Sequence, residues 1–185
     1  GYRLAHNNTV SGVIITNTSV NVTNMYGGGG FGLAWDSSNN TISGVTIMKT
    51  LVNASNNLNG GGGFGFYWYN LNNRVNNVTA VDTRVFVGNE LYGSGGFGLS
   101  NAFNNTIRSV SITNTYAKAN SDVLGSGGFG LDYAVGNNVS EVNVTETKSF
   151  SYRIYGGGGF GYRLAHNNTV SGVIITNTSV NVTNM

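Results

Sequence analysis

The stretch Gly30-Phe-Gly-Leu-Ala-Trp-Asp-Ser-Ser-Asn-Asn-Thr-Ile-Ser-Gly-Val-Thr-Ile47 decides the fold. A glycine-flanked phenylalanine opens it, a run of short polar residues follows, and β-branched residues alternating with polar ones close it. Apolar residues at every second position are typical of a β-strand, and clustered Ser and Asn are typical of the turn between two strands. No helical periodicity is present anywhere in the chain. The sequence therefore predicts an all-β protein.

The motif is repeated along the whole chain. The string Gly-(Gly/Ser)-Gly-Gly-Phe-Gly occurs five times, at nearly constant spacing, with its phenylalanine at positions 31, 64, 97, 129 and 160. Segment 1–25 is identical to segment 161–185, so a longer period encloses five inner repeats. We therefore expect one continuous solenoid over 1–185, with a five-coil unit (1–160) followed by the start of the next unit (161–185). The simplest interpretation is a window from a longer array.

Alignment on Phe-Gly gives columns of like residues. We expect a parallel β-helix, or β-solenoid, of about 32 residues per coil with roughly three short strands in each coil, stacked about 4.8 Å apart. Equivalent residues then form ladders that satisfy their own polar groups along the axis. The predicted ladders are Phe31, Phe64, Phe97, Phe129 and Phe160; Asn8, Asn40, Asn73, Asn105 and Asn137; and Thr18, Thr50, Thr83, Thr115 and Thr147.

The composition excludes several classes of protein. Charged residues are 9% of the chain, against roughly 25% in an ordinary soluble domain. There is no cysteine, which excludes a disulfide framework and a thiolate metal site. The net charge of +2 is too small for a nucleic-acid footprint, and the apolar runs are too short for a membrane span. We expect no cofactor.

The stretch quoted above resembles the right-handed parallel β-helix repeat of the pectate-lyase-like superfamily. In that repeat a Gly-apolar-x-apolar strand leads through Ser-Asn-Asn to Thr-Ile-x-Gly-x-Thr-Ile, and similar segments recur at 7–15, 104–112 and 167–175. The resemblance implies the fold and points to bacterial or archaeal surface and secreted proteins. It implies little about function, because the superfamily includes lyases, hydrolases, adhesins and scaffolds. The long coil and the glycine runs depart from it.

The glycine runs do not predict a phosphate site. A phosphate-binding loop needs a following helix and, in one form, a Gly-Lys-Ser/Thr ending, and neither is present. Glycine instead permits unusual backbone dihedrals at a tight corner. Stacked glycines would also leave a strip without side chains, where a neighbouring strand or a neighbouring solenoid could pack closely, and we expect lateral or interchain contact there.

No constellation predicts an enzyme. The acids of the chain are scattered over different columns, so no persuasive pair of carboxylates is placed for attack on a polysaccharide. His6 and His166 are one residue counted twice, at a polar corner, and are interpreted as surface side chains. Thr-x-Thr segments such as 16–18 have the spacing of an ice-binding face, but Met48 and Val81 interrupt their first column. The acids are Asp36, Asp82, Glu90, Asp122, Asp132, Glu141 and Glu146.

Asn-x-Ser/Thr sequons are frequent and fit an exported glycoprotein. The candidate glycosylation sites are Asn7, Asn17, Asn21, Asn39, Asn53, Asn77, Asn104, Asn138, Asn143, Asn167, Asn177 and Asn181. Outward aromatic residues such as Phe86, Tyr116 and Phe150 alternate with the core columns. They are interpreted as contacts between filaments or as a grip on sugars.

The sequence therefore predicts a structural segment of an extracellular or cell-surface β-solenoid filament or sheath, built from tandem near-identical units. Its expected partners are other copies of itself, end to end and laterally, together with covalent glycans. The open ends of a solenoid are unpaired strand edges, and the identical segments favour continuation. The alternative is a cell-surface adhesin or carbohydrate-binding stalk. A polysaccharide enzyme ranks third.

Overall fold

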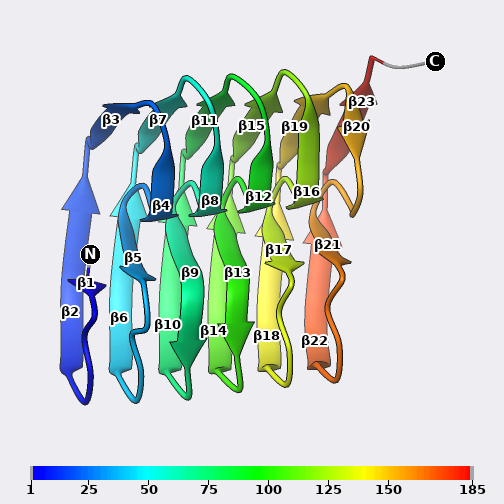
Figure 1. Cartoon of the computed structure of the whole chain (residues 1–185). Coiled ribbons are helices and arrows are strands. Elements are labelled where there is room, and N and C mark those ends of the chain that lie inside the picture. Colours follow the sequence, from blue (N-terminus) through cyan, green and yellow to red (C-terminus); the bar gives the residue numbers. More distant parts are fainter. Residues whose placement is uncertain (1, 184–185) are drawn as a thin grey trace.

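A computed structural model of the chain describes residues 2–183, and within them the protein is all-β, with no helix. The chain winds through about six coils that stack from the N-terminal end to the C-terminal end (Figure 1). Each coil runs from one repeated phenylalanine to the next, so coils 2 to 5 begin at Phe31, Phe64, Phe97 and Phe129, and coil 6 begins at Phe160. The fold is the predicted parallel β-solenoid, and its coils have the predicted length.

Equivalent strands of successive coils form four parallel sheets, which we call A to D in chain order around the coil. Sheet A contains β1 (Tyr2–Arg3), β5 (Phe31–Ala34), β9 (Phe64–Leu71), β13 (Phe97–Phe103), β17 (Phe129–Asp132) and β21 (Phe160–Arg163). Sheet B contains β2 (Thr9–Thr16), β6 (Thr41–Met48), β10 (Arg74–Val81), β14 (Thr106–Thr113), β18 (Asn138–Thr145) and β22 (Thr169–Thr176). Sheet C contains β3 (Ser19–Val22), β7 (Leu51–Ala54), β11 (Arg84–Val87), β15 (Tyr116–Ala119), β19 (Lys148–Ser151) and β23 (Ser179–Val182). Sheet D contains β4 (Met25–Gly28), β8 (Leu58–Gly61), β12 (Leu91–Ser94), β16 (Asp122–Ser126) and β20 (Arg153–Ile154).

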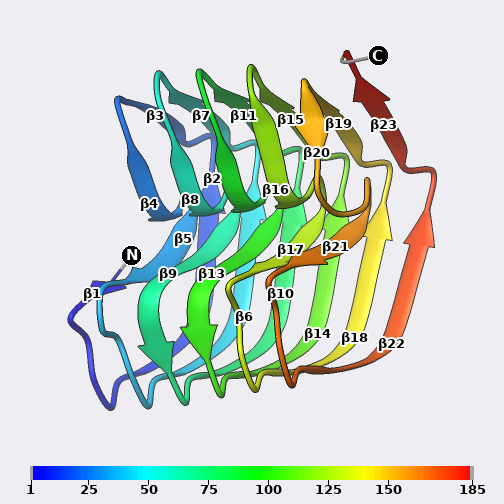
Figure 2. The ribbon, with the colours of Figure 1, turned by 45° about the vertical axis from the view of Figure 1, so that its right-hand side comes forward.

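Sheet D corrects the prediction of three strands per coil. Its strands run into the glycine runs, where glycine had predicted only a corner. In β8, Leu58 is buried and Asn59 half-buried, but Gly60 and Gly61 are both buried, so no inward–outward alternation continues through the glycines. Glycine hid this strand from the sequence because it carries no side chain to show the alternation. The turned view in Figure 2 shows sheet D as a separate layer beside sheet C.

The register of the stack follows the repeat. Phe31 pairs with Phe64, Phe64 with Phe97, and so on to Phe160, in one column of sheet A. One difference in coil length is absorbed within sheet A. Coil 3 has two successive residues with positive φ, Trp68 and Tyr69, and the register of β9 against β13 shifts there.

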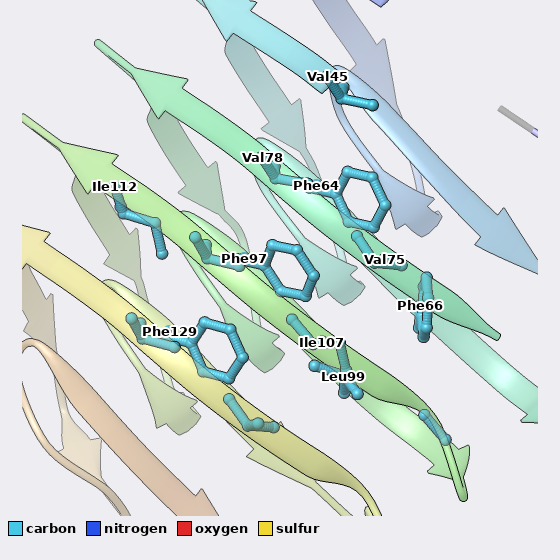
Figure 3. Packing of buried hydrophobic residues seen from close by; sticks show 14 of the residues in the cluster. Val45, Phe64, Phe66, Val75, Val78, Phe97, Leu99, Ile107, Ile112 and Phe129 are labelled. Carbon is cyan, nitrogen blue, oxygen red and sulfur yellow. The ribbon is translucent and has the colours of Figure 1, made fainter. Parts of the chain in front are cut away.

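Two hydrophobic cores fill the coil. The larger lies between sheets A and B and contains the phenylalanine column, in which neighbouring rings stack with centroids 4.6 to 5.5 Å apart. Figure 3 shows Phe64, Phe97 and Phe129 in a row beside Val78 and Ile112. Burial of each ring contributes about 2–3 kcal/mol. The smaller core lies between sheets C and D and is built mainly from Val, Ala and Leu.

The glycine runs form a waist between the two cores. An ideal Cβ on Gly62 would lie 2.1 Å from Val85 Cγ2 and 2.2 Å from the carbonyl oxygen of Gly95. A Cβ on Gly65 would lie 2.1 Å from the carbonyl oxygen of Gly27. Glycine is required because sheets A and D meet backbone to backbone here. The close approach of a neighbouring strand at the stacked glycines is therefore confirmed, since sheets A and D pack on one another there. The expected lateral contact between solenoids is wrong for the runs 60–63, 93–96 and 125–128, because these residues are buried inside the coil.

Candidate functional surfaces

The asparagine ladder uses all the hydrogen-bonding capacity of its buried amides. Asn73 accepts bonds at Oδ1 from both the backbone N–H and the Nδ2 of Asn40, at 3.0 and 2.9 Å. Its own N–H and Nδ2 donate in turn to Oδ1 of Asn105, and Nδ2 also donates to the carbonyl oxygen of Ser37. The same pattern continues through Asn137 to Asn168. Two donors and two acceptor lone pairs are thereby satisfied at each buried asparagine of the ladder, which removes the cost of burying it.

The ladder has a direction. Every step donates from the asparagine of one coil to Oδ1 of the next, from Asn8 to Asn40 and onward to Asn168. A coil therefore accepts on the side of the preceding coil and donates on the side of the following one. Coils in this register can stack only head to tail.

The threonine column is buried but poorly bonded. Thr18 donates to Thr50 at 3.1 Å. The hydroxyls of Thr83, Thr115 and Thr147 are buried and have no hydrogen-bond partner in the described structure. The expectation that hydroxyls satisfy one another along the axis is therefore wrong for these three residues, because alignment in one column does not by itself turn each hydroxyl toward the next.

Aromatic side chains gather on the outer face of sheets A and D, which we call the aromatic belt. Its first cluster joins Tyr26, Trp35 and Tyr67 with ring centroids 4.8 to 5.6 Å apart. The guanidinium carbon of Arg3 lies 4.4 Å from the centre of the Trp35 ring. The cluster continues through Trp68 and Tyr69 to Phe103.

The second cluster of the belt lies toward the C-terminal end. Arg163 places its guanidinium carbon 5.0 Å from the ring of Tyr133 and 5.7 Å from that of Tyr92. Tyr92 also donates a hydrogen bond to Glu90. Burial, followed by this bond, raises the pKa of Tyr92 to about 12.

Sheet C carries a smaller aromatic ladder on its outer face, as the alternation predicted. Phe86, Tyr116 and Phe150 follow one another with centroids 5.6 and 5.2 Å apart. Arg84, Lys118 and Lys148 lie on the same three strands, each exposed. A hollow of about 690 Å³ beside Phe86 is lined by polar residues that include Asp82 and Asn114. This face combines basic side chains with aromatic rings.

Three ion pairs join consecutive coils. Arg108 meets Glu141 at 2.7 Å on the exposed face of sheet B, and Arg153 meets Asp122 at 2.9 Å. Arg163 meets Asp132 at 2.7 Å, and that carboxylate is fully buried. Burial raises the pKa of Asp132, although the hydrogen bond from Arg163 opposes the rise. The hydrogen bonds from Arg108 and Ser109 lower the pKa of Glu141.

The predicted absence of a catalytic constellation remains a prediction. Three of the seven acids hold the ion pairs above, and Asp82 accepts a bond from Asn114 at 2.6 Å. His6 and His166 are exposed, and Nδ1 of His6 contacts the hydroxyl of Ser38 at 2.8 Å. Within residues 2–183, no group of three His, Asp or Glu is placed to hold a metal ion. Over the same residues no helix has the length and apolarity that a bilayer span requires.

The sequons lie off the strands of sheets A and D. All twelve begin on sheets B and C or on the corners beside them, and none begins on a strand of sheet A or D. Eleven of the asparagines are exposed, while Asn53 is half-buried and bonds to Asn21 at 2.8 Å. Glycans at these positions would extend from sheets B and C and the corners beside them, and one at Asn104 would lie next to Phe103 of the belt.

Comparison of the chain with protein-family models, with curated proteins and with solved structures finds no match. The general type of fold, a parallel β-solenoid, is established by the sheets themselves. Membership of the pectate-lyase-like superfamily stays a prediction.

Proposed function

We propose that the chain is a segment of an extracellular or cell-surface β-solenoid filament or sheath made of tandem units, with a structural role and no catalytic one. One observation carries this proposal. The identical segments 2–23 and 162–183 lie in coils 1 and 6 and use the same columns, but coil 1 pairs with the coil that follows it and coil 6 with the coil that precedes it. Together they describe a coil paired on both sides, as in an uninterrupted array.

Other features favour the same role. Each strand pairs only with the equivalent strands of adjacent coils, so stability grows with the number of coils. The polar asparagine ladder gives every coil one direction of growth. Exposed sequons on sheets B and C would keep a nearly uncharged fibre soluble when glycosylated, while the strands of sheets A and D that carry the aromatic belt hold no sequon.

Electron microscopy with helical analysis of the native material tests the proposal. We expect filaments with a meridional spacing of about 4.8 Å and an axial repeat of about 24 Å, or a multiple of it, since five coils form one unit. Extra density at Asn7 or Asn39 would show glycosylation in the same map. Short discrete rods with a distinct end domain would refute the fibre.

The aromatic belt favours a second candidate, a carbohydrate-binding stalk. Exposed tryptophan and tyrosine rings present apolar faces with polar edges, which suits contact with sugars. This candidate would be favoured if the purified chain binds a polysaccharide and the binding is lost in Trp35→Ala but kept in Phe86→Ala. That pattern would place the sugar-binding site on the belt. The reverse pattern would place it on sheet C.

A further inference from the structure

Arg3 and Arg163 are the same residue of the repeated unit, and each shows one half of its surroundings. Arg3 lies in coil 1, whose described neighbour is coil 2. Arg163 lies in coil 6, whose described neighbour is coil 5. In an array, the arginine of an internal unit has both neighbours at once.

On the side of the preceding unit the neighbour is a buried carboxylate. Arg163 Nε donates to Oδ1 of Asp132 at 2.7 Å, and Asp132 is 0% exposed. Its second oxygen, Oδ2, is also buried and has no hydrogen-bond partner among residues 2–183. A buried carboxylate needs a partner for its charge, and the arginine of the next unit provides it.

On the side of its own unit the same arginine meets an aromatic ring. The guanidinium of Arg3 lies over Trp35, which itself packs against Tyr26. A guanidinium donates hydrogen bonds in its plane and stacks through its face, so it can hold Asp132 on one side and Trp35 on the other. Its contacts with Tyr92 and Tyr133 then join the two clusters of the aromatic belt across the boundary between units.

This charge pair occurs once per unit. The register of sheet A places Arg3, Ala34, Tyr67, Ser100, Asp132 and Arg163 in one column. In that column coil 5 carries the acid, and the first coil of a unit carries the cation. We propose that the ion pair between Asp132 and the arginine one coil after it sets the register between units, and we call this pair the register key. Through it, the fifth coil of one unit selects the first coil of a second copy of the unit.

The key rests on the proposed array of units and adds specificity to it. The phenylalanine and asparagine columns are alike in all coils, so they attract any coil to any other. If the coil after Asp132 carried alanine, tyrosine or serine in this column, the buried carboxylate would have no cation beside it. If two successive coils both carried arginine there, the two charges would repel. The joint is therefore correct only when coil 5 meets coil 1.

Amide hydrogen exchange in the full chain, resolved by NMR, tests the key. Arg163→Ala, Arg163→Tyr and Arg163→Ser give coil 6 the side chains that coils 2, 3 and 4 carry in this column. We expect each to speed exchange in β22 about tenfold or more, because the last coil loses its counter-ion contact. In the Asp132→Asn background the same substitutions should change exchange less than about threefold. Arg3→Ala is the matched control and should leave β22 unchanged.

Equal effects of the substitutions in both backgrounds, or effects below about threefold in the wild type, would overturn the key. Failure of the fibre is a separate result. Native material without filaments would refute the proposed function even if the exchange cycle shows coupling between the two side chains. Filaments built from chains whose exchange shows no coupling would refute the key alone.

Discussion

Substitution of Gly65 tests the waist of the coil, where sheets A and D meet. Gly65 is buried in β9, and its φ lies outside the left-handed region, so an alanine there meets a problem of space alone. The new Cβ would lie 2.1 Å from the carbonyl oxygen of Gly27 and 2.3 Å from the amide nitrogen of Gly61. Both are backbone atoms in strands held by hydrogen bonds to their neighbours.

The expected cost follows from what must move. Overpacking a core costs about 1–3 kcal/mol when side chains can adjust. Because Gly65→Ala requires the backbone of β4 and β8 to shift, we expect a cost at or above the upper end of that range, about 3 kcal/mol or more. The matched control is Gly44→Asn: Gly44 has positive φ, but its column already holds Asn77 at φ 58°, and its nearest Cβ contact is 3.5 Å. Its effect should stay within about 0.5 kcal/mol.

Urea unfolding followed by circular dichroism measures both variants. With a slope of about 2 kcal/mol per molar urea, a loss of about 3 kcal/mol lowers the midpoint by about 1.5 M. A midpoint for Gly65→Ala within about 0.3 M of the wild type would refute the direct packing of sheet A against sheet D. An equally large shift in Gly44→Asn would show that any added side chain perturbs the coil. The loss in Gly65→Ala could then not be assigned to the close packing of sheets A and D.

Three further outcomes are expected. Asn73→Ala should lower the free energy of unfolding by about 3 kcal/mol, because it removes the acceptor shared by two buried donors. Thr83→Val should be neutral or stabilising, since that hydroxyl has no partner. The urea midpoints of the two variants and the wild type measure both effects. In carboxyl NMR titrations Asp132 should titrate above its ordinary pKa and Glu141 below, and Arg163→Ala should raise the pKa of Asp132 further. Asp132 therefore stabilises the fold most below its ordinary pKa and loses this contribution as pH rises through its folded pKa, while the contribution of Glu141 is lost as pH falls. Enzymatic removal of N-glycans from native material should lower its mass, and no change in mass would contradict glycosylation.

Much of the fold could be predicted because identical columns leave few arrangements. A Phe, an Asn and a Thr that recur at nearly constant spacing must align if each coil is to bury its apolar face, and the register of Phe64 with Phe97 follows. Sheet D escaped prediction because glycine removes the alternation by which a strand is recognised. The error about the glycine strip had the same source: the sequence shows that side chains are missing, but not what fills the space.

The surface features were harder to predict, since they depend on how the coil bends. Tyr26 and Trp35 are separated by the glycine run, and only the waist brings their ring centroids to 4.9 Å. The pair of Asp132 and Arg163 left a clearer signal, because the two residues are one coil length apart in the same column. Comparing charges between neighbouring coils would have found it.

In the proposed array, the columns of this solenoid have two different roles. Columns that are alike in every coil, such as the stacked phenylalanines and the directional asparagines, supply cohesion and a single direction of growth. They cannot distinguish one coil from another, because every coil presents the same residues in these columns. A column whose residue changes from coil to coil can distinguish the coils, and the column of Asp132 does so with one acid and one base per unit. Variation within the repeat is therefore as necessary as its constancy, since a fibre whose coils were all alike would stack in any register.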